Sequence, residues 1–437
     1  MTVNRRRLLL ALLIFSGILN YADRQIIAVL KPLLQDELHW TDVDYGHLTA
    51  IFQFAAAFAY VGAGWVVDRV GWRRANLLAV GTWSLAAMGH AFARTLGQFT
   101  LARVALGATE SLGTPTAIKT IAVLFEAKGR SAALGAMNAA GNIGAIVTPL
   151  FVPSLALSLG WAAAFLIMGG MGLVWVALWW LALPRIGSLA PASAGASAGD
   201  HRHVTDSTAL IGARELPGEP DTAAPRSSSP VSWRTVLTDR RTWAIAGGKV
   251  LSDQVWWFLL FWAPDFFHRE FNLDMQGFAI PLAVVYGTAA CGSLVGGWIS
   301  GRLIAGGMGI IDARKATMLV CALLVTPVPL ALWVDNYWIA VALLSLTLAA
   351  HQGFSVNLFA LTTDVTPSSR VGTVISVAAL FGNLSGMVIL QVAGWLIGGG
   401  YGYGLLFGLA AVAYLLALGW VRLLLPKGRD ASAALAA

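Results

Sequence analysis

Long apolar segments recur along the whole chain, and each ends in a short stretch that carries charges, glycine or proline. Most run for about 20 residues or more, the length that an α-helix needs to cross a hydrocarbon layer about 30 Å thick. The strands of a membrane barrel would instead alternate polar and apolar residues over about ten positions. The pattern therefore predicts an all-α, polytopic membrane protein with twelve transmembrane helices. The segments lie at about residues 8–30, 46–67, 75–93, 98–124, 132–156, 161–183, 243–267, 279–304, 315–334, 337–362, 371–396 and 402–425.

The twelve segments form two groups of six, separated by a stretch of different composition. Residues 188–228 are rich in Ala, Ser, Pro and Gly and show no helical period, which is typical of a flexible linker. We therefore expect an N-terminal six-helix half at 1–184, a linker at 185–241 and a C-terminal six-helix half at 242–437.

The two halves also resemble each other in sequence. Arg130 stands 12 residues before Asn142 in the first half, and Arg370 stands 13 residues before Asn383 in the second. Both asparagines follow a glycine. Six-helix halves in parallel repeat place the substrate site between them, near the middle of the membrane.

The distribution of charge predicts the orientation in the membrane. Charged residues make up only 12% of the chain and its mean hydropathy is +0.70, whereas soluble domains carry roughly 25% charged residues. With the N-terminus inside, cytoplasmic segments hold 22 of the 29 basic residues and external loops hold only Lys31, Arg94 and Arg269. Because basic loops stay in the cytoplasm, we expect both termini and the linker there. This asymmetry accounts for the net charge of +7 without a nucleic-acid partner.

A charged turn follows the second segment. Residues 64–74 read G-W-V-V-D-R-V-G-W-R-R. Its glycines would let helices approach closely, and Asp68 could pair with a basic residue or cap a neighbouring helix; an ordinary charged turn is the alternative. At this place in a chain of six plus six segments, the string resembles the signature of the major facilitator superfamily and implies the fold of that family. The residues that carry the resemblance are Gly64, Asp68, Arg69, Gly71, Arg73 and Arg74.

Further strings resemble one branch of that superfamily. N-Y-A-D-R at 20–24 and R-V-A-L-G-A-T-E at 103–110 are similar to the anion:cation symporters, and the strings at 253–264 and 349–359 are similar to the bacterial hexuronate (glucuronate and galacturonate) transporters among them. The resemblance implies import of a sugar-acid anion across a bacterial inner membrane. Where relatives often carry a tyrosine on the second helix, this chain has Ala56.

Two charged residues lie side by side in the first segment. A charge at the centre of the bilayer costs about 2.5–3.5 kcal/mol on insertion scales, so it persists where it lines a polar cavity or has a partner. Asp23 and Arg24 are adjacent and project about 100° apart on a helix, so each needs a partner elsewhere. An interhelical ion-pair lattice that only holds the bundle together is the alternative to a functional site.

Arg103 and Glu110 are seven residues apart in the fourth segment. They share a helix face but stand about 10.5 Å apart along the axis, too far for the pair that one helical turn allows. Burial near the middle of the membrane favours the neutral, protonated form of Glu110, which suits a proton carrier; a structural pair is the alternative. We expect Asp23 and Glu110 to carry protons, and Arg24 or Arg103 to hold the substrate carboxylate.

Other charges within the segments have simpler interpretations. Lys119 is near the cytoplasmic end of its segment, where a snorkelling side chain or a structural contact is expected. Lys249 and Asp253 are four residues apart, so they can pair on one helix face. Neutral residues that could bind sugar hydroxyls or stack on a pyranose, with helix packing as the alternative, are Tyr21, Gln53, Asn138, Asn142, Trp256, Trp257, Gln352, Asn357, Phe359 and Asn383.

These features predict a proton-coupled hexuronate symporter that works by alternating access of its two halves, as a monomer in the bilayer. A symporter of another sugar acid such as an aldonate, a proton-driven efflux antiporter and a non-transporting receptor are the alternatives. The sequence contains no metal-ligand spacing, phosphate-binding glycine loop or nucleophile arrangement. We therefore expect no metal, no cofactor and no enzymatic activity.

The orientation can be tested with single cysteines in a variant that lacks Cys291 and Cys321. A cysteine at Ser207, in the linker, should react with an impermeant maleimide only from the cytoplasmic side. A cysteine at Asn272, in a loop of the second half, should react only from the outside. The opposite accessibility would show that the linker and the termini are not cytoplasmic, contrary to the distribution of basic residues.

Overall fold

A computed structural model describes residues 3–125, 127–183, 233–367 and 370–425, and it is helical without a strand in these ranges. The all-α prediction is confirmed. Most of the predicted linker falls at 184–232, outside the described residues.

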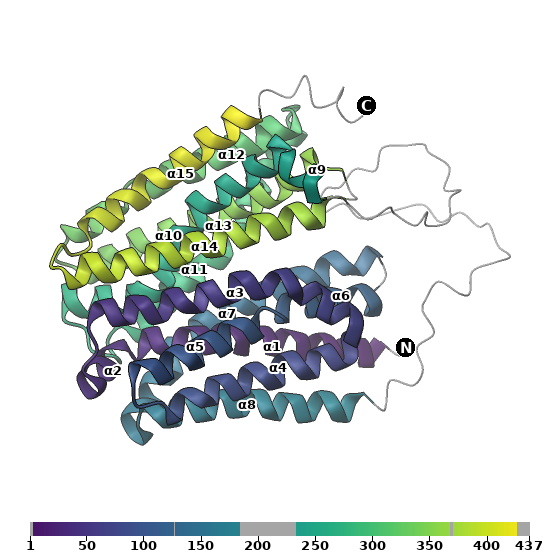
Figure 1. The fold of residues 1–437 in the computed structure, drawn as a ribbon. Helices are drawn as coiled ribbons and strands as arrows, with labels where there is room; N and C mark the ends of the chain where they lie inside the picture. The colour runs from purple at the N-terminus through teal and green to yellow at the C-terminus, as the bar shows by residue number, and fades with distance from the viewer. Residues whose placement is uncertain (1–2, 126, 184–232, 368–369, 426–437) are drawn as a thin grey trace.

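The first group of helices lies on one side of the molecule (Figure 1). Capping boxes begin two of them: the Thr41 hydroxyl accepts from the Asp44 amide, and the Thr95 hydroxyl accepts from the Gln98 amide. The elements are α1 (Val3–Val29), α2 (Lys31–Leu38), α3 (Asp42–Val70), α4 (Trp72–Gly89), η1 (His90–Phe92), α5 (Leu96–Glu110), α6 (Gly113–Leu124), α7 (Ala127–Leu159) and α8 (Trp161–Ala182).

The second group lies beside the first (Figure 1). Helix α3 packs against α14, and α7 packs against α11, so these pairs join the two groups. The elements are α9 (Trp233–Thr238), α10 (Arg240–Phe271), α11 (Ala279–Ala305), α12 (Ile310–Val325), η3 (Val328–Leu332), α13 (Tyr337–Val365), α14 (Val371–Gly398) and α15 (Gly404–Leu424).

Nine helices in the described ranges are long and apolar enough to cross a membrane. The three other predicted spans, at 75–93, 98–124 and 243–267, correspond to α4, to α5 followed by α6, and to α10. Together they account for the twelve expected segments.

The fourth predicted span is interrupted rather than continuous. Helix α5 ends at Glu110 and α6 begins at Gly113, with Ser111 and Leu112 between them. Pro115 explains the break, because it has no amide hydrogen and its ring clashes with the carbonyl of the residue four positions earlier, Ser111. The expectation of one unbroken helix over 98–124 is therefore wrong, and Glu110 lies at a helix end.

The charged turn after α3 connects three helices. Lys119 Nζ on α6 lies 2.6 Å from Asp68 Oδ1 and donates to the Val67 carbonyl at 3.2 Å, so Lys119 has the expected structural contact. Gly71 has φ +80° and forms the turn between α3 and α4. Gly64 has nothing within 4 Å of its Cβ position, so no helix approaches it closely in this structure.

A close helix approach occurs instead between α3 and α14. A Cβ atom on Gly46 would lie 2.8 Å from Gly394 Cα, and one on Gly394 would lie 2.8 Å from the Asp42 carbonyl oxygen. Only glycine allows two backbones to meet this closely. The two groups of helices therefore touch through backbone near the start of α3.

Candidate substrate and proton site

A buried ion pair joins α1 to the end of α5. Arg24 Nε donates to Glu110 Oε2 at 2.5 Å, and the two side chains are 15% and 0% exposed. The sequence predicted that Arg24 has a partner on another helix and that Arg103 does not pair with Glu110; both hold here. Glu110 Oε1 is buried and accepts no hydrogen bond in the described residues.

Two further charged side chains are buried beside this pair. Asp23 and Arg103 are 1% and 0% exposed, and neither the Asp23 oxygens nor the Arg103 guanidinium nitrogens have a hydrogen-bond partner among the described residues. Asp23 lies within electrostatic reach of both Glu110 and Arg103. Two acids and two arginines thus share one region of low dielectric, where an unpaired charge is costly.

Both arginines lie close to the Phe52 ring. Arg24 Cζ lies 5.7 Å and Arg103 Cζ 5.5 Å from its centre. Gly107 makes this possible, since a Cβ there would lie 2.4 Å from the Phe52 carbonyl oxygen. The neighbouring residue Gln53 is fully buried, and its amide oxygen and nitrogen have no partner within the described ranges.

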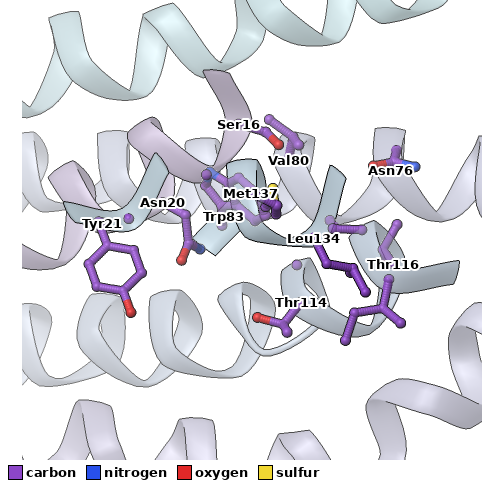
Figure 2. A pocket seen from close by; sticks show the side chains of 16 residues that line it. Ser16, Asn20, Tyr21, Asn76, Val80, Trp83, Thr114, Thr116, Leu134 and Met137 are labelled. Carbon is purple, nitrogen blue, oxygen red and sulfur yellow. The ribbon is translucent and has the colours of Figure 1, made fainter. Parts of the chain in front are cut away.

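A cavity of about 240 Å³ begins one helical turn from the ion pair. Figure 2 shows the side chains that line it. The cavity lies among α1, α4, α6 and α7, which all belong to the first group of helices, so the cavity itself does not lie between the two groups as the repeat predicts. On α1, the lining residue Tyr21 has its ring centre 5.2 Å from Arg24 Cζ. On α6, the lining residue Gly113 follows Glu110 by three positions. The cavity and the ion pair are therefore parts of one site.

The cavity wall mixes polar and apolar side chains, and none of its described residues is an acid or a base. Asn20 Nδ2, Trp83 Nε1 and Thr116 Oγ1 are buried and lack a partner among the described residues, so they can bond to a neutral hydroxyl group. Of these residues, Asn20 could have been found from the sequence, because it precedes Arg24 by one helical turn. The polar lining residues are Ser16, Asn20, Tyr21, Asn76, Trp83, Thr114 and Thr116.

The second group of helices brings one predicted aromatic residue to this site. The Trp257 ring centre lies 6.0 Å from Arg24 Cζ. Trp256 instead stacks on His351, with ring centres 5.2 Å apart. Asn357 Nδ2 donates to the carbonyls of Gly296 and Gly353, and Asn383 Nδ2 donates to its own helix at Ala379. These two amides are used within the second group.

The remaining predicted residues lie elsewhere or are partly described. Lys249 Nζ pairs with Asp253 Oδ2 at 2.7 Å, as expected, and lies 4.6 Å from the centre of the Phe359 ring. Asn142 is buried and Gln352 is half-buried. The side chain of Asn138 lies outside the described residues.

The fold and this buried, charged site define a multi-pass membrane transport protein rather than an enzyme. The chain belongs to the Major Facilitator Superfamily, which its residues 13–389 match. It is 28% identical over 304 residues to the "Probable L-galactonate transporter" of Escherichia coli K12, a match that covers 70% of this chain and 63%, less than two thirds, of that relative. It is 26% identical over 392 residues to the "Hexuronate transporter" of the same strain, with 88% of this chain and 86% of that protein covered.

A solved structure shares the fold. It is a bacterial homologue of the human lysosomal transporter Spinster in an inward-facing, unoccupied conformation, with a TM-score of 0.74 over 97% of this chain and 98% of that one. The sequence identity is 18%, so the likeness concerns the fold alone.

Proposed function

We propose that this protein imports hexuronate anions together with protons. The observation that carries the proposal is the buried Arg24–Glu110 ion pair, which lies one helical turn from a cavity whose described lining residues carry no charge. The similarity to a hexuronate transporter supports the same substrate class. The similarity to an L-galactonate transporter favours an aldonate as the second candidate.

The ion pair offers a way to couple the transport of the substrate anion to that of a proton. Arg24 contacts one carboxylate, that of Glu110, and a substrate carboxylate would compete for the same guanidinium. Protonation removes the charge on Glu110 and weakens its hold on Arg24, since charge-assisted hydrogen bonds are roughly twice as strong as neutral ones. The substrate carboxylate then takes its place. Anion binding at Arg24 is thereby linked to a proton on Glu110, and Asp23 beside Arg103 is the second candidate acid.

The cavity suits the uncharged part of a sugar acid. Its volume of about 240 Å³ is just below the range of about 300–1,000 Å³ that is usual for small-molecule sites, so it suits a ligand the size of one monosaccharide. Asn20 Nδ2 and Trp83 Nε1 would donate to ring hydroxyls, and Thr116 Oγ1 can donate or accept. The carboxylate would lie at the Arg24 end.

The proposal includes the setting in which the protein works. The excess of basic residues in the predicted cytoplasmic segments supports both termini inside a bacterial inner membrane. The first and second helix groups, with bounds near 1–184 and 242–437, would be the two halves that rock about the site. A monomer contains the complete site.

Substrate charge is the first test. Glucuronate and galacturonate should raise the melting temperature of the purified protein, because binding to the folded state adds about 2.7 kcal/mol at a hundredfold excess over Kd. Glucose and galactose lack the carboxylate that would bind Arg24, so they should leave the melting temperature unchanged. Galactonate in the same panel separates the two substrate candidates. Equal shifts from glucose and glucuronate would refute anion transport.

Glu110→Gln tests the coupling. The amide keeps the size and can still bond to Arg24, but it cannot release a proton, so uptake into proteoliposomes driven by a pH gradient should be lost while glucuronate binding is retained. Glu37→Gln is the matched control, because Glu37 accepts from Trp161 Nε1 away from the site, and it should transport normally. Loss of binding in Glu110→Gln would assign Glu110 to the substrate contact or to structure.

Gly113→Ala tests the cavity. The new Cβ would lie 3.2 Å from Trp83 Cζ3 and 3.8 Å from Asn20 Nδ2, so it narrows the space between the two donors. We expect the Kd for glucuronate to rise about tenfold, a loss of about 1.4 kcal/mol. Gly170→Ala, where a Cβ meets nothing within 4 Å, should bind as the wild type does. An unchanged Kd in Gly113→Ala would place the sugar outside this cavity.

A further inference from the structure

A second buried ion cluster joins the two groups of helices at the end that carries α2 (Figure 1). Lys31 Nζ lies 2.8 Å from Asp42 Oδ1 and 2.5 Å from Asp265 Oδ1. Lys31 is 0% and Asp265 1% exposed. The basic-residue count puts this end outside the membrane, on the side opposite the termini.

Arg269 completes the cluster. Its Nη2 lies 2.6 Å from Asp42 Oδ1 and its Nε 3.0 Å from Asp265 Oδ2. The Tyr403 hydroxyl also donates to Asp265. Two cations and two carboxylates therefore form a closed ring in which each acid contacts both bases.

The ring is divided evenly between the halves. Lys31 and Asp42 belong to α2 and α3 of the first group, whereas Asp265 and Arg269 belong to α10 of the second. Two contacts cross the boundary, Lys31–Asp265 and Asp42–Arg269. The other two stay within a half, Lys31–Asp42 and the i,i+4 pair of Asp265 and Arg269. If the halves part at this end, each retains a neutral pair.

Aromatic side chains surround Lys31 at the boundary between the two groups of helices. Lys31 Nζ lies 4.4 Å from the centre of the Trp262 ring and 5.0 Å from that of Tyr45. The Tyr45 hydroxyl donates across the boundary to the Phe261 carbonyl at 2.6 Å. Next to it, α3 and α14 meet at Gly46 and Gly394 through backbone.

We infer that Lys31, Asp42, Asp265 and Arg269 form an outer latch. It holds the two halves together at the external end and opens by splitting into two neutral pairs. Because separation leaves no charge without an opposite partner, the latch can close firmly and still release in each transport cycle. This role goes beyond the proposed substrate and does not depend on which anion is carried.

The division of the ring suggests a test that leaves each half internally paired. Lys31→Asp with Asp42→Lys keeps an opposite pair in the first half, but it sets a carboxylate at position 31 against Asp265 and an ammonium at position 42 against Arg269. Asp265→Lys with Arg269→Asp inverts the second half in the same way. All four changes together restore both attractions across the boundary.

The readout is the distance between spin labels at Asp36 and Gln276, exposed residues on either side of the latch, measured without substrate in a variant lacking Cys291 and Cys321. Each double inversion should raise the ratio of long to short distances by at least about tenfold, since like charges set together across an interface cost several kcal/mol. The fourfold variant should return to the wild-type distribution. A merely structural cluster would show no such rescue.

Asp265→Asn is a second test of the latch if an inverted variant does not fold. It keeps the shape of the side chain but removes one of the two anions. The population with long distances between the spin labels should therefore rise, but less than in the double inversions. Unchanged distances in Asp265→Asn, or in the inversions, would overturn the latch. The measurement uses no substrate, so its failure leaves the proposed transport of hexuronates untouched.

Discussion

A charge buried among transmembrane helices is costly without an opposite charge nearby, and in this protein that cost sets the arrangement around the site. Arg24 and Glu110 meet at 2.5 Å in a region that solvent barely reaches. Neither can lose its partner without leaving a buried charge uncompensated, a change that typically costs about 3–5 kcal/mol. A proton on Glu110 combined with a substrate carboxylate on Arg24 is one exchange that avoids this cost. The electrostatic constraint thus favours moving the two species together.

The break between α5 and α6 determines where the buried carboxylate of Glu110 lies. Pro115 ends the regular hydrogen bonding of α5 just past Glu110, so the carboxylate lies at a helix terminus rather than in the middle of a continuous helix. Gly113 follows the break and leaves space between Trp83 and Asn20. One local interruption therefore positions the acid and also opens the cavity that continues from it.

The sequence was sufficient for the spans and for the buried charges near their middle, such as Asp23, Arg103 and Glu110, because both follow from local rules of hydropathy and helix geometry, but it missed the buried charges nearer the helix ends. The axial distance between Arg103 and Glu110 correctly excluded their pairing. Which helix supplies the partner could not be predicted, since that depends on packing between segments distant in the chain. Lys31 shows the limit clearly: it was counted as a loop residue, yet it is fully buried. Its carboxylate partners come from α3 and α10.

The two ion clusters are connected on one side by α1 and α2, which follow each other in the chain, and on the other side by α10. Arg24 and Lys31 are seven residues apart at the end of α1 and the start of α2, and Trp257 and Asp265 are eight apart on α10. At 1.5 Å per residue these separations are about 10.5 and 12 Å, so the two clusters lie at successive levels of one interface. Arg24 faces Trp257 at the inner level, and Lys31 contacts Asp265 at the outer level. A ligand that moves α1 relative to α10 at the inner level must also change the geometry of the outer contact. Coupling between binding and opening then requires only that α1, α2 and α10 move as rigid elements, with α2 held to the end of α1 through Leu30.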